Sequence, residues 1–436
     1  MNLFDLSLRL SGFNIEAARK KIEQIQAVSD SKYRAYLHEN RAEIVKYHLN
    51  NTRFYKKLAA GNSEWENLPV LTKANLQQPL SERLSKDFTS KNVYVGKTSG
   101  SAGHPFVFAK DKWSHALSWA SFYSAYAKAE IDLSHDYQAR FYGLATGGNS
   151  RYKERFKDLI SGRYRLPIFD LSEAKMTAFL AIFKKKKKFT YIYGYTSSIV
   201  LFAKFLAQKN IVLKEICPSL KLCIVTSEML FNEDRIIVEK QLGVPLRNEY
   251  GASETGLIAF ENNDGKLQID SKLLYVEILD DNDKIVPAET EGRVVITSLY
   301  NKAHPIIRYD IGDLGILSQE SSAKKMILKK LTGRKSDFAV LPSGKVVPGL
   351  AFYYVTKKII DNDSSVKEFV ITQTHTNAFL IKYVSNFEMD QNLVKKLKKE
   401  LAAYLEPNLD VLLIRKDVIA RSKSGKLKQF TSHVNT

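Results

Sequence analysis

The chain reads FTYIYGYTSSIVLFAKFLAQKN over residues 189–210 and LKLCIVTSEMLFNEDRIIVEKQLG over residues 220–243. In both stretches a short apolar run, typical of a buried strand, precedes a segment with the periodicity of a helix. Residues 173–188 add a preceding helix, and residues 244–256 add a further strand that runs into a loop. Strands that alternate with helices of about 10–15 residues predict crossover connections and a largely parallel sheet, so the expected fold class is α/β.

The segments on either side have different patterns. Helical periodicity runs through residues 14–60 and again from about Lys112 to Ala129, with a strand, a glycine-rich loop and a second strand just before Lys112. From about Lys266 short alternating strands predict a β-rich subdomain. We therefore expect a large N-terminal α/β domain over residues 1–332, a boundary at 333–337 and a small α+β domain over residues 338–436.

The composition limits the classes of protein. The 436 residues carry 66 Lys and Arg against 47 Asp and Glu, a formal net charge of +19, and 44% of them are hydrophobic. That apolar content supports a folded core and excludes the disordered and low-complexity classes. The positive charge indicates either an anionic partner, such as a nucleotide, coenzyme A, lipid headgroups, nucleic acid or an acidic polymer, or simply a well-solvated surface.

Cysteine usage and the lack of long apolar runs suggest a compartment. Two cysteines, Cys217 and Cys223, are too few for a structural zinc site and fit a reducing environment. No apolar run approaches the roughly 20 residues that cross a bilayer, and the N-terminus has no basic segment ahead of an apolar core. We therefore expect a cytoplasmic protein without a signal peptide or membrane span.

Five short segments carry residues suited to nucleotide chemistry. Hydroxyl residues and glycines in TSGSAGHP (98–105) can bring backbone N–H groups close to a polyphosphate. In NEYGASETG (248–256) a tyrosine ring can stack on a base and a glutamate can hold Mg²⁺. A carboxylate in RYDIGD (308–313) can accept both ribose hydroxyls, and a lysine in RSKSGK (421–426) can face a developing anion. The fifth segment, GRKSD (333–337), falls at the expected domain boundary.

Taken singly, each segment also has an ordinary structural explanation. A Ser/Gly-rich stretch is more often a plain loop, an Asp-rich glycine turn is a common β-turn, and a basic tail is commonly just solvated. NEYGASETG could equally be a strand-to-turn connection with a helix-capping serine. The order and spacing of the five segments therefore carry more information than any one of them.

Together the five segments resemble the adenylate-forming superfamily, which makes acyl-, aryl- and aminoacyl-adenylates. The most similar branch is the phenylacetate–CoA ligase-like family, including members associated with capsular polysaccharide clusters. TSGSAGHP matches the family's phosphate loop, YGASETG its Tyr-Gly-x-Thr/Ser-Glu motif, RYDIGD its ribose aspartate, GRKSD its hinge and SKSGKLK its C-terminal lysine motif. The resemblance covers the chain from about residue 30 to 430.

The resemblance implies a role for each matching residue. The β- and γ-phosphates of ATP would be held by the loop residues Thr98, Ser99, Gly100, Ser101 and Gly103. The adenine and α-phosphate would be bordered by Ser227, Glu228, Tyr250, Gly251, Ala252 and Ser253. Asp313 would hold the ribose, and Arg334 would contact ribose or phosphate. The catalytic residues would be Lys426, which bridges the carboxylate and the α-phosphate, Glu254, which binds Mg²⁺, and Ser253.

The implied reaction has two steps. ATP activates a carboxylic acid as an acyl-adenylate with release of pyrophosphate, and the acyl group then passes to the thiol of coenzyme A or of a carrier protein's phosphopantetheine. The small domain would be a mobile lid that rotates about residues 333–337. The alternatives are transfer to an amine in cell-surface polysaccharide biosynthesis and a non-catalytic nucleotide-binding scaffold. Nothing resembles a helix-turn-helix, zinc finger or RNP motif, so no specific nucleic-acid partner is expected.

Two positions depart from the family pattern. Ala102 stands where the family usually has threonine, which removes one hydroxyl from the phosphate loop. Ser336 stands two positions after Arg334, where Asp or Lys is common, so the residue that acts as the hinge is left open.

Two further features fall outside the five segments. Tyr142, Tyr193 and Tyr195 stand on strands that end at the expected ATP cleft, and they would line the acyl pocket or else be core residues with satisfied hydroxyls. The run Lys184–Lys188 could touch an anionic membrane, although a solvated helix end favoured by the helix dipole is the more common arrangement. The sequence leaves the acid, the acceptor and the oligomeric state open.

Overall fold

The computed structural model describes residues 3–98, 106–143, 148–168, 171–334, 338–349, 352, 356, 366–421 and 427–434. Several residues expected at the site lie outside these ranges, namely Ser99, Gly100, Ser101, Gly103 and Lys426. Residues 335–337 of the expected hinge also lie outside them.

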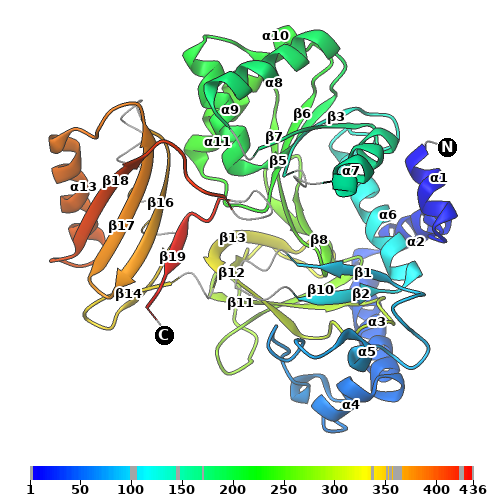
Figure 1. Ribbon diagram of the computed structural model, residues 1–436. Coiled ribbons are helices and arrows are strands. Elements are labelled where there is room, and N and C mark those ends of the chain that lie inside the picture. Colours follow the sequence, from blue (N-terminus) through cyan, green and yellow to red (C-terminus); the bar gives the residue numbers. More distant parts are fainter. Residues whose placement is uncertain are drawn as a thin grey trace.

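Within the described residues, 11 strands form one mixed sheet in the order β10-β11-β12-β13-β9-β8-β7-β6-β5-β3-β4 (Figure 1). The parallel half contains β3 (Gln138–Phe141), β4 (Arg163–Leu166), β5 (Tyr191–Tyr195), β6 (Leu222–Thr226) and β7 (Leu246–Ala252). Around it lie α7 (Gly148–Ile160), α8 (Glu173–Lys186), α9 (Thr196–Gln208), α10 (Leu213–Ile216) and α11 (Asn232–Leu242). The predicted strand–helix alternation and the α/β fold class are confirmed.

The β-rich region continues the same sheet instead of forming a separate one. Its strands are β8 (Gly256–Glu261), β9 (Leu267–Ile269), β10 (Leu274–Leu279), β11 (Glu291–Ser298), β12 (Tyr309–Leu317) and β13 (Ile327–Arg334). Each pairs antiparallel with its neighbour, beginning with the tight connection from β7 to β8. The change from parallel to antiparallel pairing therefore occurs at the YGASETG segment.

The N-terminal third packs mainly on the antiparallel half. Its elements are α1 (Leu3–Leu10), α2 (Ile15–Ala27), α3 (Asp30–Asn51), α4 (Arg53–Leu58), η1 (Trp65–Asn67), α5 (Leu80–Arg83), β1 (Tyr94–Lys97), β2 (Val107–Lys110) and α6 (Lys112–Lys128). Buried residues of these helices, such as Ile22 and Leu117, share one core with Ile278 and Ile307 of the antiparallel half. A second core, with Phe183, Phe202 and Val225, lies under the helices of the parallel half.

The described residues from Phe338 onward form a small lobe with a core of its own. It contains a hairpin of β14 (Phe338–Val340) and β15 (Val346–Pro348), together with β16 (Val366–His375), β17 (Ala378–Ser385), α13 (Gln391–Tyr404), β18 (Asp410–Lys416) and β19 (Phe430–Ser432). The last four strands form a sheet in the order β18-β17-β16-β19, with α13 on its outer side (Figure 1). None of the helices described is both long enough and apolar enough to cross a bilayer.

Candidate active site

The expected phosphate loop starts from the β1–β2 hairpin. The Thr98 amide donates to the carbonyl oxygen of Phe106, and the Phe106 amide donates to Thr98 Oγ1, both at 2.9 Å. The Phe106 ring is fully buried, and its centroid lies 6.0 Å from that of Tyr309 at the start of β12. These contacts hold the base of the loop beside the RYDIGD segment.

The YGASETG segment makes a tight turn between β7 and β8. Ala252 pairs with Gly256, whose φ of +90° favours glycine, and a Cβ on Gly251 would come within 3.0 Å of the Gly256 carbonyl oxygen. The turn leaves Ser253 exposed and Glu254 only 4% exposed. The expected phosphate contact and the expected Mg²⁺ ligand therefore lie at the tip and the base of one turn.

Glu254 lies beside a phenol and a buried cation. Tyr309 donates its hydroxyl to Glu254 Oε1 at 3.1 Å. Burial lowers the pKa of Lys110 to about 8, and the attraction of Glu254 opposes this shift. Lys110 is a residue that the sequence interpretation missed.

Tyr250 and Asp313 meet although they come from distant strands. The Tyr250 hydroxyl donates to Asp313 Oδ2 at 2.6 Å. Arg334 on β13 is the direct strand partner of Asp313 on β12, while its side chain lies outside the described part of the chain. Asp313, expected at the ribose, Tyr250, expected to stack on the base, and the position of Arg334 are therefore neighbours.

Ser227 and Glu228 follow β6 at the same edge of the sheet. Ser227 has a φ of +69°, an uncommon conformation for a residue other than glycine. The Glu228 carboxylate accepts from the Ser197 amide at 2.7 Å and from the Leu427 amide at 2.9 Å, and burial raises its pKa. Glu228 thus joins the start of α9 to the residue that follows Lys426 in the chain.

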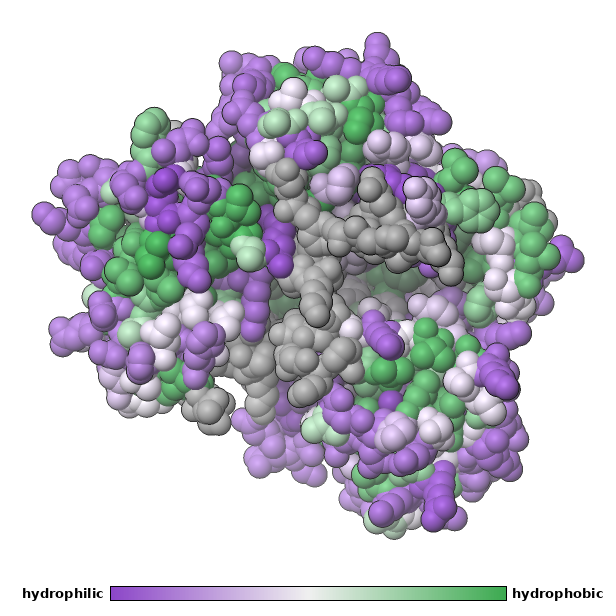
Figure 2. Space-filling model, in the orientation of Figure 1, coloured by the Kyte–Doolittle hydropathy of each residue, from purple (hydrophilic) through white to green (hydrophobic). Residues whose placement is uncertain are grey.

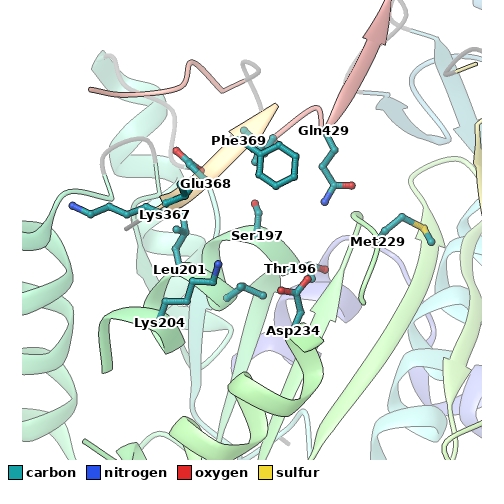
Figure 3. Close-up of a pocket in the computed structure, with 13 residues that line it drawn as sticks. Thr196, Ser197, Leu201, Lys204, Met229, Asp234, Lys367, Glu368, Phe369 and Gln429 are labelled. Atoms are coloured by element: carbon teal, nitrogen blue, oxygen red, sulfur yellow. The ribbon is translucent and has the colours of Figure 1, made fainter. Parts of the chain in front are cut away.

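A second set of contacts holds the two lobes together. Arg421 donates to Ser197 Oγ at 3.0 Å and to Glu368 Oε2 at 2.8 Å, and the side chains of Arg421 and Glu368 are only 5% and 14% exposed. Ser197 and Glu368 also border a crevice between α9 and β16 (Figure 3). The small lobe is therefore docked against the edge of the sheet where the site residues lie.

The structure brings together the three tyrosines expected at the acyl pocket. The Tyr142 ring centroid lies 4.2 Å from that of Tyr195 and 6.3 Å from that of Tyr193. Tyr195 is fully buried, whereas Tyr142 and Tyr193 are half-buried. Tyr195 therefore contributes to the core as well as to this cluster.

Two charged residues support this tyrosine cluster. The Arg140 guanidinium lies 4.5 Å from the Tyr142 ring centroid and 4.8 Å from that of Tyr193. Glu249 accepts hydrogen bonds from Tyr126 at 2.6 Å and Tyr193 at 2.9 Å, and burial raises its pKa. Neither charge was singled out from the sequence, although a charge inside an apolar strand is a signal that could have found both.

A magnesium ion would have one carboxylate ligand here. Within the described residues no group of three or more His, Cys, Asp or Glu side chains could hold a metal ion. A single carboxylate, Glu254, suits Mg²⁺, which commonly binds one or two carboxylates and takes its other ligands from nucleotide phosphates and water.

Comparisons with known proteins show which sequences and folds this chain resembles. No family model matches the chain. It is 25% identical over 385 residues to Protein CapK of Staphylococcus aureus, a match that covers 82% of this chain and 80% of that protein. It is also 25% identical over 228 residues to phenylacetate-coenzyme A ligase of Aromatoleum evansii, covering 48% and 51% of the two chains.

The fold is similar to that of a solved acyl-CoA ligase. The 2-hydroxyisobutyryl-CoA ligase in its postadenylation state matches with a TM-score of 0.68 at 14% identity, covering 92% of this chain and 90% of that one. The same ligase in its thioesterification state matches with a TM-score of 0.56. The expected resemblance in sequence to phenylacetate-coenzyme A ligase is confirmed, and the fold is that of this solved acyl-CoA ligase.

Proposed function

We propose that this chain is an AMP-forming acid–thiol ligase, which activates a carboxylic acid with ATP and passes the acyl group to a thiol. The observation that carries the proposal is the convergence of Thr98, Tyr250, Glu254 and Asp313, which come from three separate segments of sequence. A non-catalytic nucleotide-binding scaffold would not need a tyrosine cluster beside its nucleotide site.

In the first step a carboxylate oxygen attacks the α-phosphorus of ATP, a P–O bond breaks and pyrophosphate leaves. The product is a mixed anhydride of the acid and AMP. In the second step a thiol attacks the acyl carbon and AMP leaves with the electrons of the broken C–O bond. Negative charge grows on the phosphate oxygens in the first step, so nearby cations lower its barrier.

Different residues bind the different parts of ATP in this proposal. The loop from Thr98 to Gly103 holds the β- and γ-phosphates, Tyr250 faces the adenine, and Asp313 with Arg334 holds the ribose. Lys426 supplies a positive charge to the reacting phosphate. Bound Mg²⁺, held through Glu254, would supply further charge neutralisation.

The acid would pack against the rings of Tyr142, Tyr193 and Tyr195, which suits an aryl or medium-sized apolar acid. We also propose coenzyme A, or a carrier protein's phosphopantetheine, as the acceptor. A role in cell-surface polysaccharide biosynthesis is suggested by the motif resemblance alone.

The small lobe would act as a lid that turns about residues 333–337 between the two steps. The TM-score is higher against the postadenylation state of the solved ligase than against its thioesterification state. This difference supports a lobe arrangement like that of the postadenylation state. The Leu427 amide donates to Glu228, which borders the expected adenine site, and this contact supports the proposed role of the C-terminal lysine motif.

The test is ATP–pyrophosphate exchange with a panel of carboxylic acids, with hydroxylamine added to trap any acyl-adenylate. We expect exchange with a subset of acids. K426A should slow the exchange by a factor of a hundred or more, on the order of one strong electrostatic contact, whereas K428A, which changes a neighbouring exposed lysine, should leave it unchanged. Exchange with no acid, or an equal rate in K426A, would contradict the proposal.

A further inference from the structure

Helix α7 packs against the protein through its charged side. Asp158, which is 2% exposed, accepts from Arg163 at 2.7 Å and from Arg165 at 2.9 Å, both on β4. Glu154, one turn earlier, accepts from Arg165 at 3.1 Å. The face of α7 that lies against the sheet is thus held by ion pairs.

The opposite side of α7 carries apolar side chains into solvent. Tyr152, Phe156 and Leu159 lie at positions i, i+4 and i+7, so they form one stripe, and they are 78%, 64% and 72% exposed. A surface helix ordinarily turns its apolar stripe toward the core and its charges toward water. In Figure 2 apolar side chains lie at the surface on the upper right, where Figure 1 places α7 and α1. This reversed polarity leaves an apolar surface that needs a partner.

The lysine run Lys184–Lys188 lies next to α7. The Lys186 ammonium is 4.9 Å from the ring centroid of Tyr164 on β4, and the Arg155 guanidinium of α7 is 5.6 Å from the same centroid. Lys184, Lys185, Lys187 and Lys188 are exposed. Nowhere in the described ranges does a carboxylate pair with any lysine of this run. A cationic ridge therefore adjoins the apolar stripe.

We propose that the stripe of α7 and the run Lys184–Lys188 together dock the protein on an anionic membrane surface. A solvated helix end accounts for the lysines but not for the outward apolar stripe. A second copy meeting the same surface would bring two lysine runs together, and like charges repel. An amphipathic helix with cations beside an apolar face has the chemistry that binds the interface of an anionic bilayer. Because α7 begins shortly after Tyr142, docking would hold the tyrosine cluster close to the lipid.

The test is co-sedimentation of the full chain with vesicles of phosphatidylglycerol and phosphatidylcholine, and with vesicles of phosphatidylcholine alone. We expect binding to the anionic vesicles only, weakened by added salt. F156S/L159S should weaken it roughly ten-fold or more through the loss of inserted apolar surface. K184Q/K185Q should weaken it roughly thirty-fold, because each lysine near such a surface contributes about 1 kcal/mol.

Matched variants elsewhere on the surface keep the test specific. I236S/V418S removes two side chains that are 66% and 72% exposed, and K395Q/K396Q removes two exposed lysines of α13. Both should bind vesicles like the unaltered chain, and circular dichroism should show every variant folded. Equal binding to neutral vesicles, or unchanged binding of F156S/L159S, would overturn the proposal. So would analytical ultracentrifugation showing a dimer that F156S/L159S dissociates while vesicle binding persists.

Discussion

At the scale of single residues, the RYDIGD segment combines residues that hold the fold with Asp313, which lies at the candidate site. Arg308 is buried and donates to the Leu68 carbonyl oxygen at 2.7 Å. Asp310 accepts from the Gly312 amide at 2.8 Å and from Arg293 at 3.1 Å, which holds the turn. Asp313 instead accepts from Tyr250 at the site. Two carboxylates three positions apart therefore have different partners, and we expect only Asp313 to serve the nucleotide.

Substitution of each aspartate should separate these tasks. D313N keeps the shape but weakens the acceptor, so the KM for ATP in pyrophosphate exchange should rise roughly ten-fold with little loss of stability. D310N breaks the contact with Arg293 and should lower the free energy of unfolding in urea by about 2 kcal/mol. If D310N raised the KM for ATP as D313N does while leaving stability intact, the division would be wrong.

At the scale of elements, α3 is tied to the antiparallel half by a buried histidine at its C-terminal end. His48 Nδ1 lies 2.8 Å from Thr52 Oγ1 and Nε2 lies 2.9 Å from the Asn301 carbonyl oxygen, so the neutral ring donates through Nε2. Burial lowers the pKa of His48 to about 4. The folded state thus holds this ring neutral at a pH where the unfolded chain protonates it.

This burial predicts a pH dependence of stability. The unfolded chain binds the additional proton between about pH 6.5 and 4, so the free energy of unfolding should be constant above that window and fall within it. The contribution of His48 is about 3 kcal/mol. Of this, about 2 kcal/mol should appear as a difference in the free energy of unfolding in urea between neutrality and pH 5.

H48Q is the matched variant, because glutamine can donate to Asn301 but does not titrate. It should reduce the pH slope without removing it, since burial also lowers the pKa of His115 and His304. An unchanged slope in H48Q would show that His48 contributes nothing to the acid sensitivity.

Element α7 was not expected from the sequence. Its charged residues face the sheet and its apolar residues face solvent, so nothing in the pattern indicated which side would be covered. The sequence also showed no sign of β19, because its strand character comes from parallel pairing with β16, far away in sequence. Pairing partners and ion-pair networks of this kind are tertiary properties.

At the scale of the whole molecule, the pose of the small lobe depends on a few polar contacts. Arg421 joins Ser197 of the large lobe to Glu368 of its own lobe, and Leu427 donates to Glu228. The side chains of Arg421 and Glu368 are largely buried. Replacing Arg421 therefore leaves the Glu368 carboxylate buried without this partner, and separation of the lobes would return the carboxylate to water.

R421M should therefore shift the lobes toward separation. We expect faster hydrogen exchange at the Leu427 amide and pyrophosphate exchange reduced roughly ten-fold. R415M changes an arginine of the same lobe whose ion pairs are exposed, and it should alter neither measurement. Unchanged exchange of Leu427 in R421M would show that Arg421 does not hold this pose.

The local order of this protein follows from its sequence. Apolar periodicity determined the strands and helices of residues 173–256, and small residues at Gly251 and Gly256 determined the tight turn that presents Ser253 and Glu254. These features depend on neighbouring residues, whose preferences a linear sequence displays directly. The same holds for the antiparallel strands and for the hairpin of residues 338–348.

Only the tertiary structure decided which of these segments meet. Tyr250 and Asp313 are 63 positions apart, and Glu228 and Leu427 are 199 apart, yet each pair forms a hydrogen bond. Lys110, Arg140 and Glu249 stand out as charged residues of the site, and the α7 stripe as an exposed apolar surface, only once the burial of each side chain is known. The physical reason is that burial and long-range pairing depend on how the sheet curves and the lobes pack, which no single segment encodes.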